Sequence, residues 1–450
     1  MYQKRPSITQ GKDWTLILLY TAIAIVGLVC IFSVEYRGNE DVVSSFFAFK
    51  KNYSKQFIYL LSCIVIATFI LLMDSKFFTA TPNLLYIFGI GLMLATFVVG
   101  KTVNGSRSWI PLGFMNLQPV ETCKIFTALA LAKYLSRSET NFAKPQSQMI
   151  AAGICFLPVL FSLLQNETGL ALVYFSFLLP MYREGFPPVY LVTGASLGVL
   201  LVLTLLLSPI QLIIGLTLIA IAVVYFSKRK IKRQKNMLFM IVAIWLISLF
   251  FVGVAVPFLF KHVFQKYQAD RIFSMVGRDN PYVDELPADT TTVALPKTKK
   301  TGSDNENYNV KQSKIAIGSG GFWGKGFLKG TQTQGDFVPE QHTDFIFTSL
   351  GESFGFIGSF ILMLLYLSLL LRIVFIAERQ RSTFSRVYAY SVAAIIFFHV
   401  AINIGMTIGL APVIGITLPM MSYGGSSLLT FTVLIFILIK LDTDRQMVLR

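Results

Sequence analysis

The run LGESFGFIGSFILMLLYLSLLLRIVFI, residues 350–376, decides the fold class of this chain. A helix needs about 20 apolar residues to cross a lipid bilayer, and this run is long enough. Comparable runs recur along the whole sequence. We therefore predict an all-α polytopic membrane protein with about 10–12 transmembrane helices and one long extracytoplasmic loop.

The sequence on either side of this run follows the same pattern. We expect further spans near 14–34, 56–73, 83–100, 121–135, 149–165, 168–182, 189–207, 210–227, 238–260, 387–408 and 424–440, which makes twelve with the first. The runs 121–135 and 168–182 are short, and 121–135 contains charges. The spans before and after Ser208-Pro209 meet there in either a tight turn or a kink.

The composition agrees with a lipid solvent. Hydrophobic residues make up 54% of the 450 residues and charged residues 14%, whereas a soluble domain has roughly 25% charged residues. The formal charge is +16, but Lys and Arg lie between the apolar runs, so we expect contacts with membrane lipids and no nucleic-acid partner. The four cysteines fall in apolar runs and only three histidines occur, so we expect no disulfide and no metal site.

Short basic loops indicate the orientation. Lys and Arg crowd residues 228–235 and 379–386, and in the twelve-span topology both loops lie on the same side as the two termini. By the positive-inside rule, that side is the cytoplasm. Long loops do not follow this rule, so the Lys-rich stretch 261–345 is compatible with it.

The outward loops then contain most of the sequence detail. They are residues 101–120, 261–345 and 409–423. Within the long loop, the Pro/Thr/Asp-rich stretch 279–308 is expected to be a disordered insertion. We treat residues 1–450 as one membrane domain.

The stretch PEQHTDFIF, residues 339–347, changes abruptly from polar residues to the apolar run that becomes a helix. Asp344 therefore lies where a helix begins, near the outer boundary of the bilayer. The simpler interpretation is a helix N-cap, because an aspartate there accepts amide hydrogen bonds. An ionisable residue at membrane depth is nevertheless a functional candidate, and a carboxylate partly removed from water suits a general base.

Glycines are dense in KIAIGSGGFWGKG, residues 314–326. They allow tight turns, and the backbone amides of such turns can bind anions. A flexible surface loop is the alternative. The spacing matches neither a P-loop nor a dinucleotide-binding motif.

Polar residues also occur within the expected spans. Glu121 and Lys124 are three residues apart and share a helix face, so they neutralise each other, line a polar cavity, or do both. His399 and Asn403 are four apart, and we expect an interhelical hydrogen bond there. The small residues of LPMMSYGGSS, 418–427, permit either close helix packing or a broken helix.

Five stretches together resemble the shape, elongation, division and sporulation (SEDS) family. They are NGSRSWIPLGFMNLQPVETCK (104–124), QADRIF (268–273), SKIAIGSGGFWGKGFLKGTQTQ (313–334), PEQHTDFIF (339–347) and LPMMSYGGSS (418–427). The resemblance extends over nearly the whole chain. The version GKGFLKGTQTQ looks like the elongation branch of the family more than its division branch.

The resemblance implies a peptidoglycan glycosyltransferase of the bacterial inner membrane, which polymerises lipid II during cell elongation beside a class B penicillin-binding protein. The Asp of the family's HTDF motif, here Asp344, is the proposed catalytic residue. The Glu and Lys of QPxExxK, here Glu121 and Lys124, form an ion pair beside the substrate cavity. Further substrate-binding candidates are Arg107, Trp109, Gln118, Arg271, Lys314, Lys325, Glu340, His342 and Ser422. No motif requires a cofactor, although a divalent cation could assist the diphosphate.

The chain departs from the family pattern in three places. The family usually has about ten spans, and the surplus here lies between 183 and 237, where two extra helices would preserve the topology. The segment usually written QPDLGTA contains Glu167 in place of its Asp. Ser108, and not an Arg, precedes Trp109, which leaves the role of the neighbouring Arg107 open.

In the expected reaction, a sugar hydroxyl of lipid II attacks the anomeric carbon of the growing glycan, and the lipid diphosphate leaves. Asp344 takes the hydroxyl proton. Cations stabilise the charge that develops on the diphosphate, and the candidates are Arg107, Lys124, Arg271, Lys314 and Lys325. Two alternatives stay open: a lipid II flippase, which needs a polar path to the cytoplasmic side, and a scaffold, in which Asp344 substitutions leave polymer synthesis intact.

Overall fold

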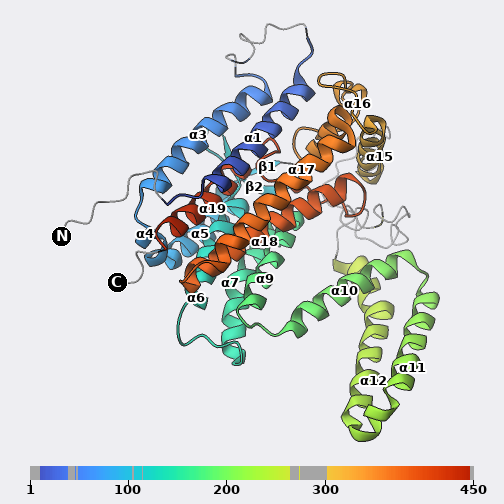
Figure 1. Cartoon of the computed structure of the whole chain (residues 1–450). Coiled ribbons are helices and arrows are strands. Elements are labelled where there is room, and N and C mark those ends of the chain that lie inside the picture. The colour runs from blue at the N-terminus through green and yellow to red at the C-terminus, as the bar shows by residue number, and fades with distance from the viewer. Residues whose placement is uncertain are drawn as a thin grey trace, which may run out of the picture. The chain divides into compact units, whose positions relative to one another are not determined.

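The structure, a computed structural model, describes residues 11–38, 46, 49–103, 106–113, 115–263, 273 and 302–445 (Figure 1). Helices dominate these residues. The chain forms two compact units, one from Met1–Phe186 with Asn309–Arg450 and the other from Pro187–Tyr308. The first unit contains every candidate site residue that the structure describes.

The first unit contains most of the helices and a small sheet. Its helices are α1 (Trp14–Glu35), α3 (Asn52–Leu72), α4 (Ser75–Ala80), α5 (Pro82–Val99), α6 (Pro119–Leu135), α7 (Pro145–Leu164), α8 (Thr168–Val173), the 3-10 helix η1 (Tyr174–Phe177), α9 (Leu178–Arg183), α16 (Thr331–Gln334), α17 (Ile346–Glu378), α18 (Thr383–Thr407) and α19 (Gly425–Thr443). Strands pair antiparallel in the order β1 (Lys101–Val103), β2 (Ser106–Pro111) and β3 (Asn116–Leu117). Proline starts α5, α6 and α7, where its missing N–H costs no intrahelical hydrogen bond.

The described residues of the second unit, 187–263 and 302–308, are almost all helical. Its helices are α10 (Pro188–Leu206), α11 (Pro209–Arg233) and a continuous run of α12 (Lys235–Phe250), the π-helix η2 (Phe251–Ala255), α13 (Val256–Phe258) and the π-helix η3 (Leu259–Val263). Ser208 accepts a hydrogen bond from the amide of Gln211 in a capping box, so Ser208-Pro209 is a turn between two separate helices. Helices α10 and α11 occupy the region 183–237, where two surplus helices are expected.

Helix α15 (Gly302–Gly320) follows in the chain and crosses the boundary between the units. The expectation of a disordered insertion over 279–308 is wrong for its last residues, which are helical from Gly302. Residues 279–301 lie outside the described residues. In its described part, the expected loop 261–345 includes the helices α15 and α16.

Nine helices of the described residues are long and apolar enough to cross a bilayer. All nine coincide with expected spans, which confirms the polytopic all-α fold class. The other three expected spans are helical but short or interrupted. Helix α6 has 17 residues, 168–182 is divided among α8, η1 and α9, and the apolar part of α10 is Pro188–Thr204.

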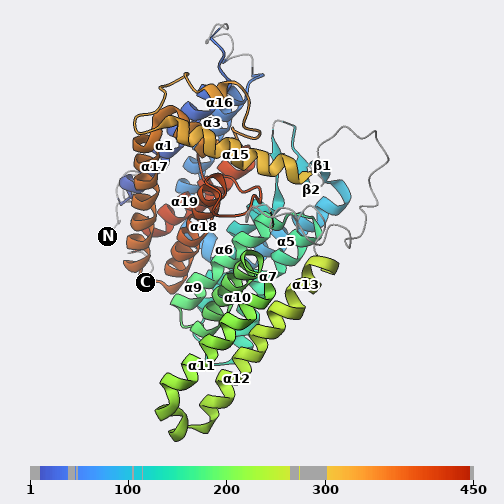
Figure 2. The ribbon, with the colours of Figure 1, turned by 90° about the vertical axis from the view of Figure 1, so that its right-hand side faces the viewer.

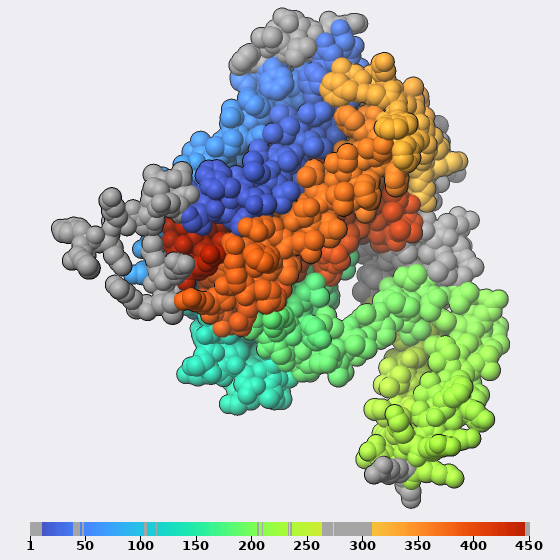
Figure 3. Space-filling model, viewed as in Figure 1, coloured from blue at the N-terminus to red at the C-terminus, as the bar shows by residue number. Residues whose placement is uncertain are grey.

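Helices α18 and α19 form the centre of the first unit. The most apolar window of α19 is 78% buried and that of α18 is 61% buried, against 22% for α3 and α5. Tyr388 of α18 and Phe431 of α19 are fully buried. Helix α17 packs against both α1 and α18, and its contact with α1 runs along the face shown in Figure 3. The apolar surfaces of α3 and α5 are therefore left for lipid.

The segment 408–424, between α18 and α19, is not helical and enters the packed interior. Its Met421 is fully buried. A Cβ on Gly27 of α1 would lie 2.5 Å from the Met421 carbonyl oxygen, and one on Gly169 of α8 would lie 2.0 Å from that of Ile414. Gly27 and Gly169 therefore permit close packing of α1 and α8 against this irregular segment. Such backbone is tolerated at membrane depth because protein surrounds it.

Ion pairs join the start of α1 to the ends of α17 and α19. Asp13, which precedes α1 and is 5% exposed, accepts hydrogen bonds from Arg372 of α17 and from Arg379, which follows that helix. Arg379 also pairs with Asp442 of α19. Arg379, expected as a topology signal, therefore also links three helices.

Candidate active site

Asp344 lies two residues before α17, at the end of a turn. The N-cap residue of α17 is Phe345, so Asp344 lies one position before the N-cap. Asn403 of α18 donates a hydrogen bond to the carbonyl of Asp344 over 2.8 Å. The side chain of Asp344 is half-buried, and its Oδ2 is 3.5 Å from where a Cβ on Gly415 would lie. The carboxylate therefore faces the 408–424 segment at a glycine that leaves space beside it.

The loop before α17 is fastened to the loop before α19. The Ser422 hydroxyl donates to the Thr343 carbonyl over 2.6 Å and accepts from the Leu418 amide over 2.8 Å. The Tyr423 amide donates to the His342 carbonyl over 2.8 Å. The predicted residues His342 and Ser422 thus meet next to Asp344. Ser422 is 3% exposed, so its hydroxyl holds the two loops together and does not face a substrate.

Glu340 shapes the turn that leads to Asp344. Its φ is +54°, and its carbonyl accepts a hydrogen bond from the Phe345 amide over 3.1 Å. Its exposed carboxylate accepts from the Thr343 hydroxyl over 2.8 Å. Glu340 is therefore an exposed acid in the same loop as Asp344.

A buried charged cluster connects α6 to the 408–424 segment. Lys124 is fully buried, with its Nζ 2.8 Å from Glu121 Oε2 and 2.7 Å from His399 Nε2. His399 Nδ1 lies 3.0 Å from the Thr417 carbonyl, so the ring proton is assigned to Nδ1 and Nε2 accepts from the lysine. The expected pair of Glu121 with Lys124 is confirmed, and the expected interhelical hydrogen bond of His399 joins α18 to α6.

Asn403 extends this connection to Asp344. It lies one helical turn after His399, and its Nδ2 donates to the carbonyls of Ile416, over 2.6 Å, and Asp344, over 2.8 Å. His399 and Asn403 thus hold two consecutive carbonyls, those of Thr417 and Ile416. The backbone around Asp344 is therefore positioned by buried polar side chains of α6 and α18.

Gln118 occupies another junction. Its amide donates to the Ser426 hydroxyl of α19 over 3.0 Å, and its side chain donates to Glu167 Oε1 over 3.2 Å. Glu167, which replaces the Asp of the family pattern, also accepts from the hydroxyls of Ser106 and Ser108 on β2. Gln118 is 7% exposed and fastens the sheet, the start of α8 and the start of α19 to one another.

Arg107 and Trp109 lie on β2. The exposed guanidinium of Arg107 donates to the carbonyls of Gly100 and Val98 over 3.0 Å each. These carbonyls are at the C-terminal end of α5, so Arg107 caps that helix in this structure. Trp109 is half-buried and pairs with Lys101 in the register of β1 and β2.

The glycine-dense motif packs against α17. Its first part, through Gly320, belongs to α15 and is not a loop. A Cβ on Gly320 would lie 2.1 Å from the Gly351 carbonyl oxygen, and one on Gly324, whose φ is +84°, would lie 2.2 Å from that of Ser353. These glycines are required because a side chain would collide with the backbone of α17.

The same contact supplies hydrogen-bond donors to the backbone carbonyls at a break in α17. The backbone at Gly355 is not helical, with φ +62° and ψ −155°, which leaves nearby carbonyls without helical partners. The amides of Lys325 and Gly326 donate to the carbonyls of Glu352 and Ser353 over 3.0 Å each. These two amides are engaged within the protein and are not free to bind an anion.

Lys325 is held in an ion pair. Its Nζ lies 2.7 Å from Glu352 Oε1 and 2.6 Å from the Thr331 hydroxyl. Glu352 is fully buried and also accepts from the amides of Gln332 and Thr333 over 2.9 Å each, which satisfies the first turn of α16. Glu352 is not among the predicted site residues, although a single acid within a long apolar run was the available signal.

Lys314 is an exposed candidate cation on α15, which lies crosswise to α17 (Figure 2). The neighbouring Ser313 fixes this helix, because its hydroxyl lies 2.8 Å from the Thr407 carbonyl and 2.6 Å from the Thr348 hydroxyl. Lys314 Nζ is 2.3 Å from where a Cβ on Gly409 would lie. Within the described part of the chain, no acidic side chain lies within ion-pair distance of Lys314. Its ammonium is thus available at the edge of the 408–424 segment.

Comparison with known proteins identifies the family. The sequence profile of the FtsW, RodA and SpoVE family, described as "Cell cycle protein", matches residues 13–214 and 213–447. The chain belongs to this family. The resemblance inferred from the sequence motifs is thereby confirmed.

Relatives within the FtsW, RodA and SpoVE family match most of the chain. The peptidoglycan glycosyltransferase MrdB of Escherichia coli strain K12 is 32% identical over 366 residues, which cover 81% of this chain and 78% of MrdB. The peptidoglycan glycosyltransferase RodA of Treponema pallidum strain Nichols is 30% identical over 445 residues, which cover 93% and 94% of the two chains.

Solved structures share the fold of this family member. A chain from "Structural coordination of polymerization and crosslinking by a peptidoglycan synthase complex" matches with a TM-score of 0.66 and 24% identity, covering 97% of this chain and 99% of that chain. The rod shape determining protein RodA of Thermus thermophilus matches with a TM-score of 0.60 and 22% identity, covering 97% and 98%.

The site of this family member differs in part from the sequence-based expectation. The structure brings Asp344, Glu340, His342 and Ser422 together, and it connects Glu121 and Lys124 to them through α18. It directs Arg107, Gln118 and Lys325 into contacts that hold the fold. Arg271 lies outside the described residues. Among the described residues, no group of three or more His, Cys, Asp or Glu could hold a metal ion.

Proposed function

We propose that this chain is a peptidoglycan glycosyltransferase that polymerises lipid II into glycan strands during cell elongation. Family membership and the names of the curated relatives support this activity. The protein would act as a multi-pass protein of the bacterial inner membrane with both termini in the cytoplasm. Its partner would be a class B penicillin-binding protein, which is supported by the likeness to a complex that coordinates polymerization and crosslinking.

The observation that carries the proposal is the fixed position of Asp344. Asn403 holds its carbonyl, Ser422 holds the carbonyl of the preceding Thr343, and its side chain faces Gly415. A general base must be held within hydrogen-bond reach of the hydroxyl that it deprotonates. A rigid, half-buried carboxylate beside a glycine meets this requirement, so we assign it as the catalytic base.

The reaction joins an acceptor lipid II to a donor glycan on a polyprenyl diphosphate. A sugar hydroxyl oxygen of the acceptor forms a bond to the anomeric carbon of the donor, while its proton passes to Asp344. The bond from that carbon to the diphosphate oxygen breaks, and the electron pair leaves with the lipid diphosphate. The growing strand is thereby transferred to the acceptor.

The departing diphosphate requires a cation, and we assign Lys314 to this role. It is exposed on α15 above Gly409, in the same segment that faces Asp344. Lys325 is instead engaged by the buried Glu352, and Lys124 is fully enclosed beside Glu121. We therefore treat Lys124 as a positioning residue that acts through His399. Preorganised cations of this kind stabilise charge that develops in the transition state.

The test is polymerisation of labelled lipid II by the purified full chain, with and without its penicillin-binding partner. In detergent, Asp344→Asn should be folded like the wild type. It should form no glycan polymer, because the base is absent. Asp74→Asn is the matched control, since Asp74 is exposed at the other helix ends and an asparagine preserves its capping of α4.

Polymer synthesis by Asp344→Asn at the wild-type rate would refute the assignment of Asp344 as the base. Absence of polymer synthesis by the wild-type chain would favour the scaffold or flippase alternatives. A lipid II transport assay in vesicles separates those two, because only a flippase moves the substrate. Lys314→Ala should lower kcat more strongly than it raises KM for the lipid substrate, because the ammonium is assigned to charge that develops in the transition state.

A further inference from the structure

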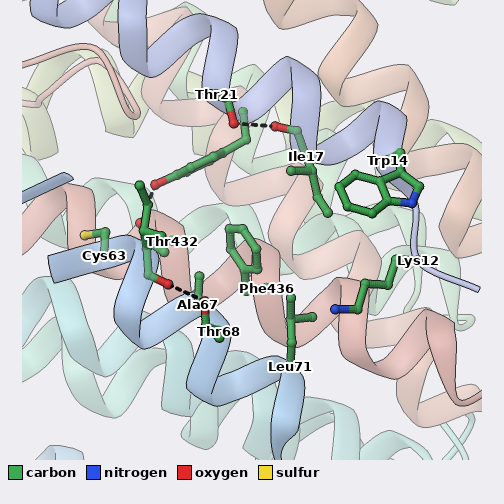
Figure 4. Close-up of a pocket in the computed structure, with 12 residues that line it drawn as sticks. Lys12, Trp14, Ile17, Thr21, Cys63, Ala67, Thr68, Leu71, Thr432 and Phe436 are labelled. Atoms are coloured by element: carbon green, nitrogen blue, oxygen red, sulfur yellow. Dashed lines mark hydrogen bonds between the residues drawn. The ribbon is translucent and has the colours of Figure 1, made fainter. Parts of the chain in front are cut away.

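A groove lies between α1, α3 and α19 at the helix ends opposite Asp344 (Figure 4). Its volume is about 230 Å³. Its floor contains the buried residues Tyr20, Ala67 and Phe436, and its rim contains the exposed residues Trp14, Ile64 and Thr68. All three helices belong to the first unit, so the groove is a feature of one compact body.

The wall of the groove offers an apolar surface although it contains hydroxyl groups. The hydroxyls of Tyr20 and Thr432 bond to each other over 2.7 Å. The hydroxyl of Thr68 donates to the Ile64 carbonyl over 2.8 Å. These polar atoms are satisfied within the protein, so an occupant of the groove meets chiefly methyl and ring surfaces.

One end of the groove is cationic. Figure 4 shows Lys12 extending over the groove towards Leu71, with Trp14 at the same end. No acidic side chain of the described residues lies within ion-pair distance of Lys12. Burial and the nearby ammonium of Lys440 lower the pKa of Lys12. An anion placed beside Lys12 would relieve this repulsion.

The dimensions match one leaflet of a membrane. The lining residues of α1 run from Trp14 to Thr21, which is roughly 10 Å along a helix that rises about 1.5 Å per residue. Half of a hydrocarbon core is about 15 Å. Trp and Lys at a helix end are typical of the interface between lipid and water. The apolar part therefore lies at the depth of acyl chains and Lys12 at the depth of headgroups.

We propose that this groove binds one acyl chain of an anionic phospholipid, with the lipid phosphate against Lys12. Charge complementarity at Lys12 selects an anionic headgroup, and the apolar wall between α1 and α3 receives the chain. The site is distinct from the Asp344 site and would contact the leaflet in which α1 begins.

The experiment is native mass spectrometry of the purified full chain titrated with phosphatidylglycerol or with phosphatidylcholine. The wild type should retain phosphatidylglycerol in preference to phosphatidylcholine. Lys12→Ala should weaken retention of phosphatidylglycerol about fivefold, since a basic residue near an anionic lipid contributes about 1 kcal/mol. Lys76→Ala, which removes an exposed lysine at the same helix ends but outside the groove, should have no effect.

A second pair of variants tests the chain-binding part. Thr68→Trp places a large side chain at the rim and should reduce retention of phosphatidylglycerol, whereas Val65→Trp, on an exposed face of α3 away from the groove, should not. The proposal is overturned if the wild type retains both lipids equally, if Lys12→Ala and Lys76→Ala behave alike, or if the two tryptophan variants do.

Discussion

Removing one charge of the buried pair between Glu121 and Lys124 should destabilise this protein more than removing both. Glu121 is 2% exposed and Lys124 is fully buried, with their charged atoms 2.8 Å apart. The second contact of Lys124 is His399, an uncharged acceptor in the assigned tautomer. Glu121→Gln therefore leaves a buried ammonium without a counter-charge.

The expected magnitude follows from this enclosure. Removing one partner of a buried ion pair costs about 3–5 kcal/mol, whereas replacing both by neutral residues of similar volume is often close to neutral. In a domain of 150–250 residues, 1 kcal/mol shifts Tm by about 2–4 °C, so Glu121→Gln should lower Tm by on the order of 10 °C. The double variant with Glu121→Gln and Lys124→Met should recover most of that loss.

The assay is thermal unfolding of the detergent-purified chain at pH 7, followed by tryptophan fluorescence. Glu378→Gln is the control, because it breaks an exposed ion pair with Arg183 and should leave Tm unchanged. Equal Tm values for Glu121→Gln and the double variant would refute the argument. Although the double variant should be stable, it should polymerise lipid II more slowly than the wild type. The reason is that the connection from Lys124 through His399 is broken.

Two further predictions concern the fold. Gly355→Ala should greatly reduce the monodisperse fraction in size-exclusion chromatography. The φ angle of Gly355 is +62°, and a Cβ there would lie 2.4 Å from the Gly324 amide nitrogen. Gly194→Ala is the control and should not reduce this fraction, because the space around Gly194 is open. Burial raises the pKa of Asp13, but hydrogen bonds from Arg372, from the Leu16 amide and from Arg379 lower it by more, so its folded-state pKa lies below the usual value. Its stabilisation is therefore complete above a pH of about 4 and is lost as the pH falls through the folded-state pKa. Asp13→Asn should lower Tm at pH 7 in differential scanning calorimetry and approach the wild type in strongly acidic buffer; a constant difference across pH would contradict this.

Local contacts of the candidate site could be predicted from the sequence, whereas distant ones could not. Glu121 and Lys124 are one helical turn apart, so a helical prediction already places them on one face. His399 and Asn403 are polar residues in an apolar run and had to bond to some partner. The partner of His399 is Lys124, 275 positions away, and the way in which α6 packs on α18 decides that choice.

The sequence by itself determined that this chain is a bundle of membrane-spanning helices, because long apolar runs can satisfy their backbone in lipid only as helices. It also placed Asp344 at the start of one of them. Only the tertiary structure decided that the glycine-dense motif packs against α17 and that Glu352 engages Lys325. The reason is that such contacts depend on which backbones approach to within van der Waals distance, and no periodicity of residues along the chain encodes that approach.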